Sequence, residues 1–367
     1  MKHATCILMI ALLAALVAAA WAASAAQAAA PTFAEASAFA LRASPDKSAG
    51  RPNGDGQTGG QAEQPGGGDE RVVTDARAHD FEPWRLPKNY RNPDGSFNQA
   101  ALVEQQKKRL DVMNKRLVAK FKLVETPHYL VFSDAQQPVT DLFAKWAEAL
   151  YANLCKQFAV GPSDRIWDGK CILVISNTRA TFLAQAATFD GFNAGHAGAY
   201  FAIEAAEPDM PRLVHICVPL DTRDPRRLQE LFAHEGTHAF FQLYKKPVDL
   251  PLWLHEGLAE FMVVVNDKDL RGEKQVYAKR YAQRGTPIEG ILVRETGQGL
   301  EYPEYSVAYT LVDFLVAAGK DKFKKFVDEL KDGKDQETAL KDAYGWTLID
   351  LERRWRVYVG QVLSREN

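Results

Sequence analysis

The sequence is poor in cysteine, and the cysteines it has are not arranged for pairing. Of four, Cys6 lies in the first ten residues and the others are Cys155, Cys171 and Cys217. None belongs to a C-x-x-C pair, so dithiol redox chemistry is not expected. An odd number of cysteines after the N-terminal segment excludes a complete disulfide framework, although one bridge is permitted. Cys155 with Cys171 is the pair to test.

Other classes are excluded by missing charge and missing motifs. Lys and Arg number 45 against 47 Asp and Glu, a balance that indicates neither a nucleic-acid partner nor an anionic membrane surface. There is no G-x-S-x-G elbow, which disfavours serine-hydrolase chemistry. The glycine-rich stretch from Gly191 to Gly198 lacks the strand and the Lys-Ser/Thr ending of a phosphate-binding loop. His196 within it is interpreted as a loop residue.

The first thirty residues have the layout of an export signal. Lys2 precedes an apolar run from Cys6 to Trp21, and Ala26-Gln27-Ala28 fits the small-x-small cleavage rule. We therefore predict a signal peptide over residues 1–28, with Ala30 as a second cleavage choice and an uncleaved anchor as the alternative. The chain is expected to be exported, periplasmic or extracellular, with no stable membrane span after cleavage.

The remaining chain divides by composition. Residues 29–80 are rich in Gly, Pro, Ala and Gln and show no periodicity, which predicts a disordered tether. Residues 81–126 are predicted as an N-terminal helical segment, with a helix over 98–123.

Strands are expected before the main motif and helices after it. Alternation and apolar runs predict strands in 127–265, namely 128–134, 171–176, 198–204 and 213–220, beside a helix over 140–158. Residues 266–367 are predicted to be a helical C-terminal subdomain, with helices over 306–318, 320–330, 336–343 and 347–362. This order of elements indicates an α+β fold.

The clearest motif lies in "LFAHEGTHAFFQLY". His234 and His238 are four residues apart, so on a helix their side chains lie one turn apart on one face. Asp224 and Pro225 predict the start of that helix. Glu235 lies about 100° around the axis from His234, where it reaches a metal-bound water without being a ligand. Zinc catalysis needs three protein ligands and an open position, so the motif requires one more ligand.

The downstream sequence supplies that ligand. The H-E-x-x-H pattern alone arises by chance in about one chain per hundred of this length. The residues around it are therefore needed to distinguish a metal site from an ordinary helix. Eighteen positions after His238, "LPLWLHEGLAEF" provides Glu256 on a second helix. Glu260, one turn later, is placed to accept a hydrogen bond from a ligating imidazole. The residues next to Glu256 and Glu260 are apolar, which argues against a solvent-exposed acidic face of the helix. The sequence therefore predicts Zn²⁺ on His234, His238 and Glu256.

"HEGTH" and "WLHEGLAEF" together resemble the gluzincin clan of zinc metallopeptidases, and most closely its secreted bacterial peptidase MA-like branch. The resemblance covers His128 to the C-terminus. It implies a zincin-like fold, in which a small mixed β-sheet and the H-E-x-x-H helix precede a helical C-terminal lobe. It also implies that Glu256 is the third ligand and Glu235 the general base. His255 departs from the clan, where Asn or Ser is frequent, and a structural or substrate-side role is expected for it.

The clan often uses a tyrosine downstream of the third ligand to stabilise the oxyanion. In "EYPEYSVAYTLVDFL" the resemblance favours Tyr305, with Tyr309 as the weaker alternative and Tyr302 just before them. Aromatic residues at i and i+4 on a helix are more often core residues than catalytic ones, so both interpretations stay open.

These residues predict a secreted zinc-dependent metallopeptidase that hydrolyses peptide bonds by zinc-activated water, with Glu235 as general base. A peptide or protein substrate is expected to add to the strand that starts with Gly198, Ala199 and Tyr200. Gluzincin aminopeptidases carry a Gly-x-Met-Glu-Asn motif, and its absence from residues 182–228 favours an endopeptidase. A monomer is expected.

Two other hypotheses stay open. A catalytically inactive secreted binding or scaffold protein of zincin fold would lack a ligand or the base, and all four residues are present here. An autoinhibited precursor would have residues 81–123 covering the cleft, and limited proteolysis in the tether would then raise its activity.

Overall fold

A computed structural model of the chain describes residues 87–161, 164–191, 193–195, 197–204, 210–246, 248–295 and 298–362. The predicted signal peptide, the predicted tether and His196 lie outside the described residues. The residues that are described belong to one compact unit.

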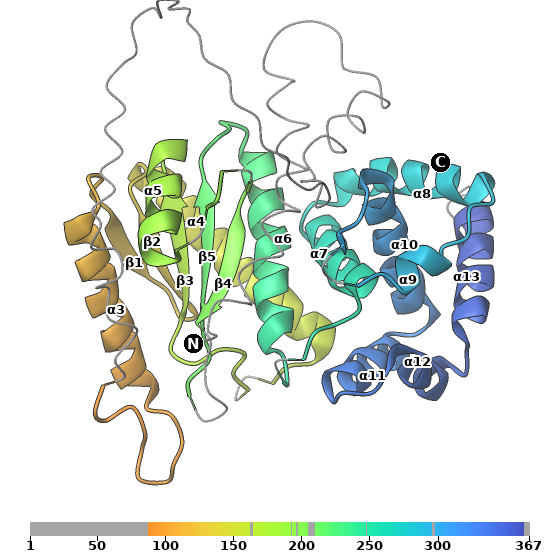
Figure 1. Cartoon of the computed structure of the whole chain (residues 1–367), viewed down its shortest axis with the longest axis horizontal. Helices are drawn as coiled ribbons and strands as arrows, with labels where there is room; N and C mark the ends of the chain where they lie inside the picture. The colour runs from red at the N-terminus through yellow and green to blue at the C-terminus, as the bar shows by residue number, and fades with distance from the viewer. Residues whose placement is uncertain are drawn as a thin grey trace, which may run out of the picture. The chain divides into compact units, whose positions relative to one another are not determined.

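The elements follow the predicted order, with strands first and helices last (Figure 1). The part up to the main motif consists of α3 (Gln99–Arg116), β1 (Lys122–Glu125), β2 (Tyr129–Ser133), α4 (Gln137–Phe158), β3 (Cys171–Ser176), α5 (Arg179–Phe189), β4 (Tyr200–Glu204), β5 (Leu213–Pro219) and α6 (Pro225–Leu243). The rest is helical: α7 (Leu252–Asn266), η2 (Lys268–Leu270), α8 (Arg271–Gln283), α9 (Glu289–Leu292), α10 (Tyr302–Ala318), α11 (Lys320–Lys331), α12 (Gln336–Tyr344), α13 (Leu348–Val357) and η4 (Tyr358–Val362). The α+β class and the helical C-terminal part are confirmed.

The strands form one small mixed sheet in the order β1-β2-β3-β5-β4. The inner strands β2, β3 and β5 run parallel, and the outer strands β1 and β4 pair antiparallel to their neighbours. Every residue of the inner strands is buried. Continuous burial arises because helices cover both faces, which is why these strands read as unbroken apolar runs such as "CILVIS".

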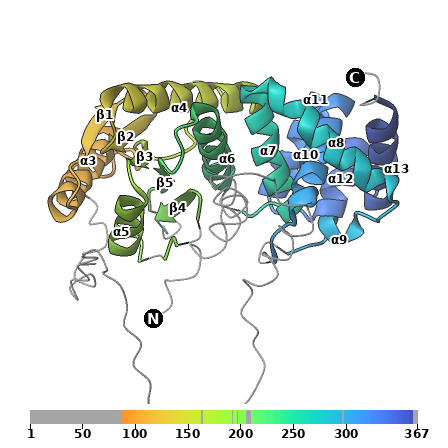
Figure 2. The same cartoon turned by 90° about the horizontal axis from the view of Figure 1, so that it is seen from above.

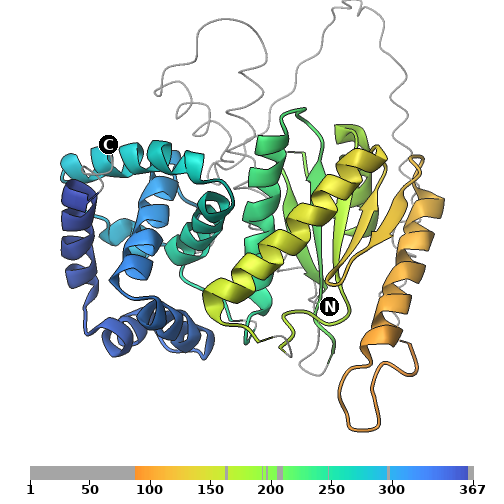
Figure 3. The same cartoon turned by 180° about the vertical axis from the view of Figure 1, so that it is seen from behind.

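The two faces of the sheet carry different helices. Helices α4 and α6 pack on one face, and Figure 3 shows α4 crossing it diagonally. Helices α3 and α5 lie on the other face, so the sheet is sandwiched between the two pairs (Figure 2). Strand alternation divides β5 accordingly, since Ile216 faces α6 while His215 and Cys217 face α3 and α5.

The predicted helix over 98–123 is wrong at its C-terminal end. Helix α3 ends at Arg116, where Leu117 takes an extended backbone conformation. The Asn114 amide then binds both the N–H and the C=O of Phe121, at 2.7 and 3.0 Å, and turns the chain back. The residues from Lys122 onward form strand β1, which the sequence did not indicate.

Helix α7 joins the sheet-bearing part to the helical part, packing on α6 and on α10. No helix in the described ranges is both long and apolar enough to cross a membrane. Cys155, Cys171 and Cys217 are all free thiols, so the bridge considered between the first two is absent.

Candidate metal centre

Helix α6 carries the two histidines on a well-formed scaffold. The Asp224 side chain accepts a hydrogen bond from the Arg226 N–H and Pro225 occupies the first turn, so the helix begins where the sequence predicted. Its sheet-facing side is apolar and buried. This anchoring presents His234 and His238, one turn apart, to helix α7.

The structure brings His234, His238 and Glu256 together. The two Nε2 atoms lie 3.0 Å apart, and Glu256 Oε2 lies 3.5 Å from each of them. Ligands bound tetrahedrally to zinc at 2.0–2.1 Å are separated by about 3.3 Å. The three donor atoms therefore have the mutual spacing of ligands that share one ion.

Each imidazole has its other nitrogen engaged. His234 Nδ1 lies 3.1 Å from Glu260 Oε1, as the sequence led us to expect. His238 Nδ1 lies 3.0 Å from His255 Nε2. When both Nδ1 atoms carry the proton, both Nε2 lone pairs converge on the Glu256 carboxylate. Three converging lone pairs repel one another, and a cation among them removes that repulsion. The donor set therefore fits Zn²⁺.

The charges of the cluster are strongly coupled. Burial lowers the pKa of His234, but hydrogen bonds and attraction to Glu256 and Glu260 outweigh this and raise it to about 10. Burial raises the pKa of Glu256, and the two histidines more than reverse the effect. Burial acts likewise on Glu260, whose pKa is brought down to about 2 by Lys274 of α8 and by His234. The carboxylates are thus anionic at neutral pH.

Glu235 is buried beside the ligands without being one of them. Its side chain is 1 % exposed, and Oε2 has no hydrogen-bond partner among the described residues. Burial raises its pKa, against the opposing pull of His234 and His238. A buried carboxylate with an unused oxygen is suited to accept a proton from a small molecule such as water.

The two candidate tyrosines of α10 face different surroundings. The Tyr305 hydroxyl is buried and has no hydrogen-bond partner among the described residues. Burial raises the pKa of Tyr305, and the carboxylates of Glu256, Glu260 and Glu235 add to the effect, which places it near the metal ligands. The neighbours that influence Tyr309 are instead Asp313 and Arg271. The Tyr309 hydroxyl also has no hydrogen-bond partner among the described residues, so the nearby carboxylates are what favour Tyr305 as the tyrosine closer to the metal ligands.

Strand β4 lies at the edge of the sheet next to α6. Gly198 and Ala199 precede the strand, and the Tyr200 side chain points to the far face, where its hydroxyl hydrogen-bonds Asp190. Phe201 faces His238, with its ring centroid 6.0 Å from that of His238. Any role of Tyr200 toward a substrate at the metal centre is therefore limited to its backbone.

Sequence reasoning missed two contributors. His255 was expected to have a structural or substrate-side role, but its contact with His238 was not specified. The only available signal was its position beside Glu256. Lys274, which pairs with Glu260, comes from a helix with no motif, so nothing in the sequence indicated it.

Similarity to known proteins is found among solved structures, whereas no protein-family model and no curated protein matches this sequence. The chain is similar to an M1 zinc metallopeptidase from Deinococcus radiodurans, with 14% identity, a TM-score of 0.36 and 66% of this chain covered. A point mutant of that enzyme gives 14% identity, a TM-score of 0.39 and 65% coverage. This chain spans about half of that protein, since 52% of it is covered in both cases.

Proposed function

We propose that this chain is a zinc-dependent metallopeptidase, with His234, His238 and Glu256 as the zinc ligands. The observation that carries the proposal is the convergence of three donor atoms at 3.0–3.5 Å, with each imidazole held by a partner at its other nitrogen. The sequence resemblance to the gluzincin clan supplies the reaction class. We further propose that the protein acts after export.

Zinc, when bound, lowers the pKa of a coordinated water to about 7 and polarises a peptide carbonyl. Glu235 accepts the proton of the attacking water and passes it to the leaving amine, so the carboxylate is regenerated in each turnover. The Tyr305 hydroxyl donates a hydrogen bond to the oxygen that gains charge in the transition state. Burial keeps both groups out of bulk water, where their effect would be weaker.

The substrate is proposed to be an extended peptide that pairs with the outer edge of β4. In the described part of the sheet, that edge has no partner strand, and β4 lies beside the helix that holds the histidines. Internal cleavage is favoured because the amine-binding motif of the related aminopeptidases is missing from the sequence.

The test compares matched glutamate variants on α6. Glu235→Gln is expected to keep its zinc and to lower kcat on an unfolded protein such as casein by at least about 10²- to 10⁴-fold. Glu230→Gln changes the same group on the same helix, where Glu230 pairs with Arg227, and is expected to keep activity. Glu256→Ala is expected to lose the zinc bound by His234 and His238. Full activity in Glu235→Gln would refute the mechanism.

A zinc-bound wild-type protein that cleaves no peptide, before or after limited proteolysis of the tether, would instead favour the binding or scaffold hypothesis. Activity that appears only after proteolysis would favour the precursor hypothesis.

A further inference from the structure

A second group of metal-ligand side chains lies on the opposite face of the sheet. His215 and Cys217 are two residues apart on β5, so both lie on one face of the sheet, where His215 lines a cavity together with residues of α3 and α5. Asp190, which ends helix α5, reaches the same point. One donor atom each from Asp190, His215 and Cys217 lie within 4.8 Å of one another. The group is independent of the site on α6 and of the function proposed for it.

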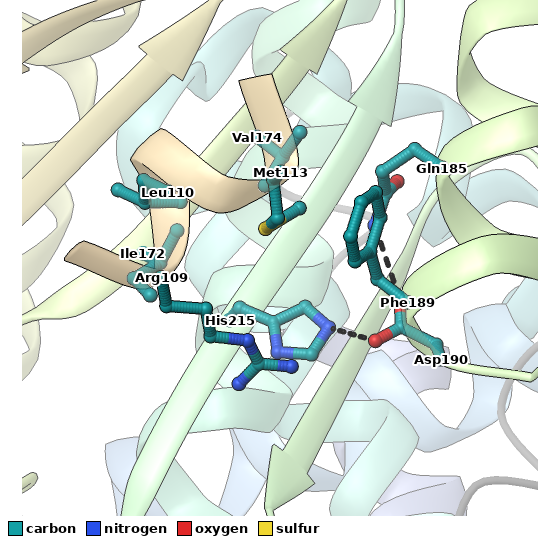
Figure 4. A pocket seen from close by; sticks show the side chains of 9 residues that line it. All are labelled: Arg109, Leu110, Met113, Ile172, Val174, Gln185, Phe189, Asp190 and His215. Carbon is teal, nitrogen blue, oxygen red and sulfur yellow. Dashed lines mark hydrogen bonds and ion pairs between the residues drawn. The ribbon is translucent and has the colours of Figure 1, made fainter. Parts of the chain in front are cut away.

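The geometry within this group suits a shared ion. His215 Nε2 lies 3.1 Å from Asp190 Oδ1, close to the separation of about 3.3 Å between tetrahedral nitrogen and oxygen ligands of zinc. Figure 4 shows both side chains turned toward each other at the edge of a cavity. Imidazole, carboxylate and thiolate are the three side-chain donors that zinc uses in proteins.

Neighbouring side chains hold Asp190 in position. Its Oδ2 accepts hydrogen bonds from Gln185 Nε2, at 3.0 Å, and from the Tyr200 hydroxyl. These contacts leave Oδ1 facing His215. Ligating carboxylates are commonly fixed in this way by outer hydrogen bonds, which set their orientation before the ion arrives.

The adjoining cavity limits what can bind. Its volume is about 10 Å³, and Arg109, Gln185, Asp190 and His215 form its polar lining. That volume holds about one water molecule and excludes an organic ligand. Three protein ligands and one water complete a tetrahedral zinc site.

A plain buried ion pair accounts for only part of this group. Asp190 pairs with His215 at 3.1 Å and also attracts the Arg109 guanidinium. The Cys217 thiol, which is 0 % exposed, takes no part in the Asp190–His215 ion pair. A divalent ion would bind the thiolate, with the proton released to solvent, and Asp190 and Cys217 would supply two negative charges beside the positive charges of the ion and of Arg109.

We propose that Asp190, His215 and Cys217 bind a second zinc-class divalent ion, with one water as its fourth ligand. Because two ligands come from β5 and the third ends α5, the ion ties this helix to the sheet. The site is structural, and it lies on the face away from the proposed catalytic centre.

Cobalt substitution tests this proposal while Asp190, His215 and Cys217 are left unmutated. The site on α6 has no sulfur, so a sulfur-to-cobalt charge-transfer band in the near-ultraviolet requires a separate site that includes a cysteine thiolate. The full-length Glu256→Ala protein, loaded with Co²⁺, is expected to show this band and to bind one Zn²⁺ per chain by mass spectrometry. Absence of the band, together with a metal-free Glu256→Ala protein, would overturn the proposal.

Thiol variants assign the band to a residue. Cys217→Ser is expected to abolish it, whereas Cys171→Ala, which removes an equally buried thiol from the neighbouring strand, is expected to keep it. His215→Gln is expected to lower the metal content of the wild-type chain from two ions to one. A band that persists in Cys217→Ser would also overturn the assignment.

Discussion

Gly257, the residue after the proposed third ligand, is predicted to be irreplaceable because α7 and α10 touch there. A Cβ atom built on Gly257 would lie 2.5 Å from the Ala308 carbonyl oxygen and 2.8 Å from its carbonyl carbon. Val312 Cγ2 would also lie at 2.8 Å. Two of the three atoms are backbone, so no side-chain rotation relieves the overlap. Gly257→Ala must push the two helices apart.

The expected loss is the balance of two opposing effects. Alanine is favoured over glycine in a helix by up to about 1 kcal/mol. Overpacking that forces a backbone shift costs about 1–3 kcal/mol, and contacts this short belong in the upper part of that range. The net prediction is a loss of about 1–2 kcal/mol in the free energy of unfolding. Since α7 carries Glu256 and α10 carries Tyr305, activity is expected to fall as well.

Urea titration of the purified variants measures the change in the free energy of unfolding. The urea concentrations at the unfolding midpoint are compared between variants whose dependence of stability on urea has the same slope. Two other glycines provide controls. Gly272→Ala on α8 meets nothing within 4 Å and is expected to be neutral or stabilising. Gly236→Ala on α6 would meet Leu150 Cδ2 at 2.6 Å, the end of a flexible side chain, and is expected to cost less than Gly257→Ala. A Gly257→Ala protein as stable as the wild type would refute the reasoning.

Three further predictions concern single groups. His255→Ala removes the partner of His238 Nδ1 and is expected to weaken zinc binding about 10- to 100-fold in a chelator competition, and unchanged affinity would contradict that role. Tyr305→Phe is expected to keep the zinc and the KM while lowering kcat by about 10²- to 10³-fold; an unaltered kcat would exclude Tyr305 as an oxyanion donor. Burial lowers the pKa of Lys331 from 10.5 to about 8, so between these values the unfolded chain binds more protons. Wild-type stability is therefore expected to rise by about 3 kcal/mol relative to Lys331→Met from about pH 8 to about pH 10.5, and a pH-independent difference in urea titrations would disprove this.

Long periodic elements could be predicted from the sequence, and short ones could not. The runs that became β2, β3 and β5 are apolar throughout because both faces of each strand are covered. Strand β1 is exposed along most of its length and lacks that signal. Helix α5 was missed because its apolar residues show little periodicity, although Thr178 caps it by accepting from the Thr181 N–H.

The two metal-ligand groups differ in the same way: one follows from a local sequence pattern and the other does not. The spacing of His234 and His238 and the downstream Glu256 could be read directly, because helical periodicity places residues four apart on one face. The group on the other side of the sheet could not be predicted. Asp190 lies 25 positions before His215, and only the packing of α5 against β5 brings them together. No local pattern encodes that contact.

Charge balance at the centre between α6 and α7 is consistent with the proposed divalent ion. Glu235, Glu256 and Glu260 are carboxylates in or beside it, and Lys274 is the ammonium paired with one of them. With all three carboxylates ionised, three negative charges against one positive charge leave an excess of two, and uncompensated buried charge costs several kcal/mol per ion. A proton on His234, whose pKa is raised to about 10, offsets half of that excess. A zinc ion offsets all of it. Glu260 therefore does more than orient an imidazole, because without its charge a single proton would suffice and the preference for a divalent ion would weaken.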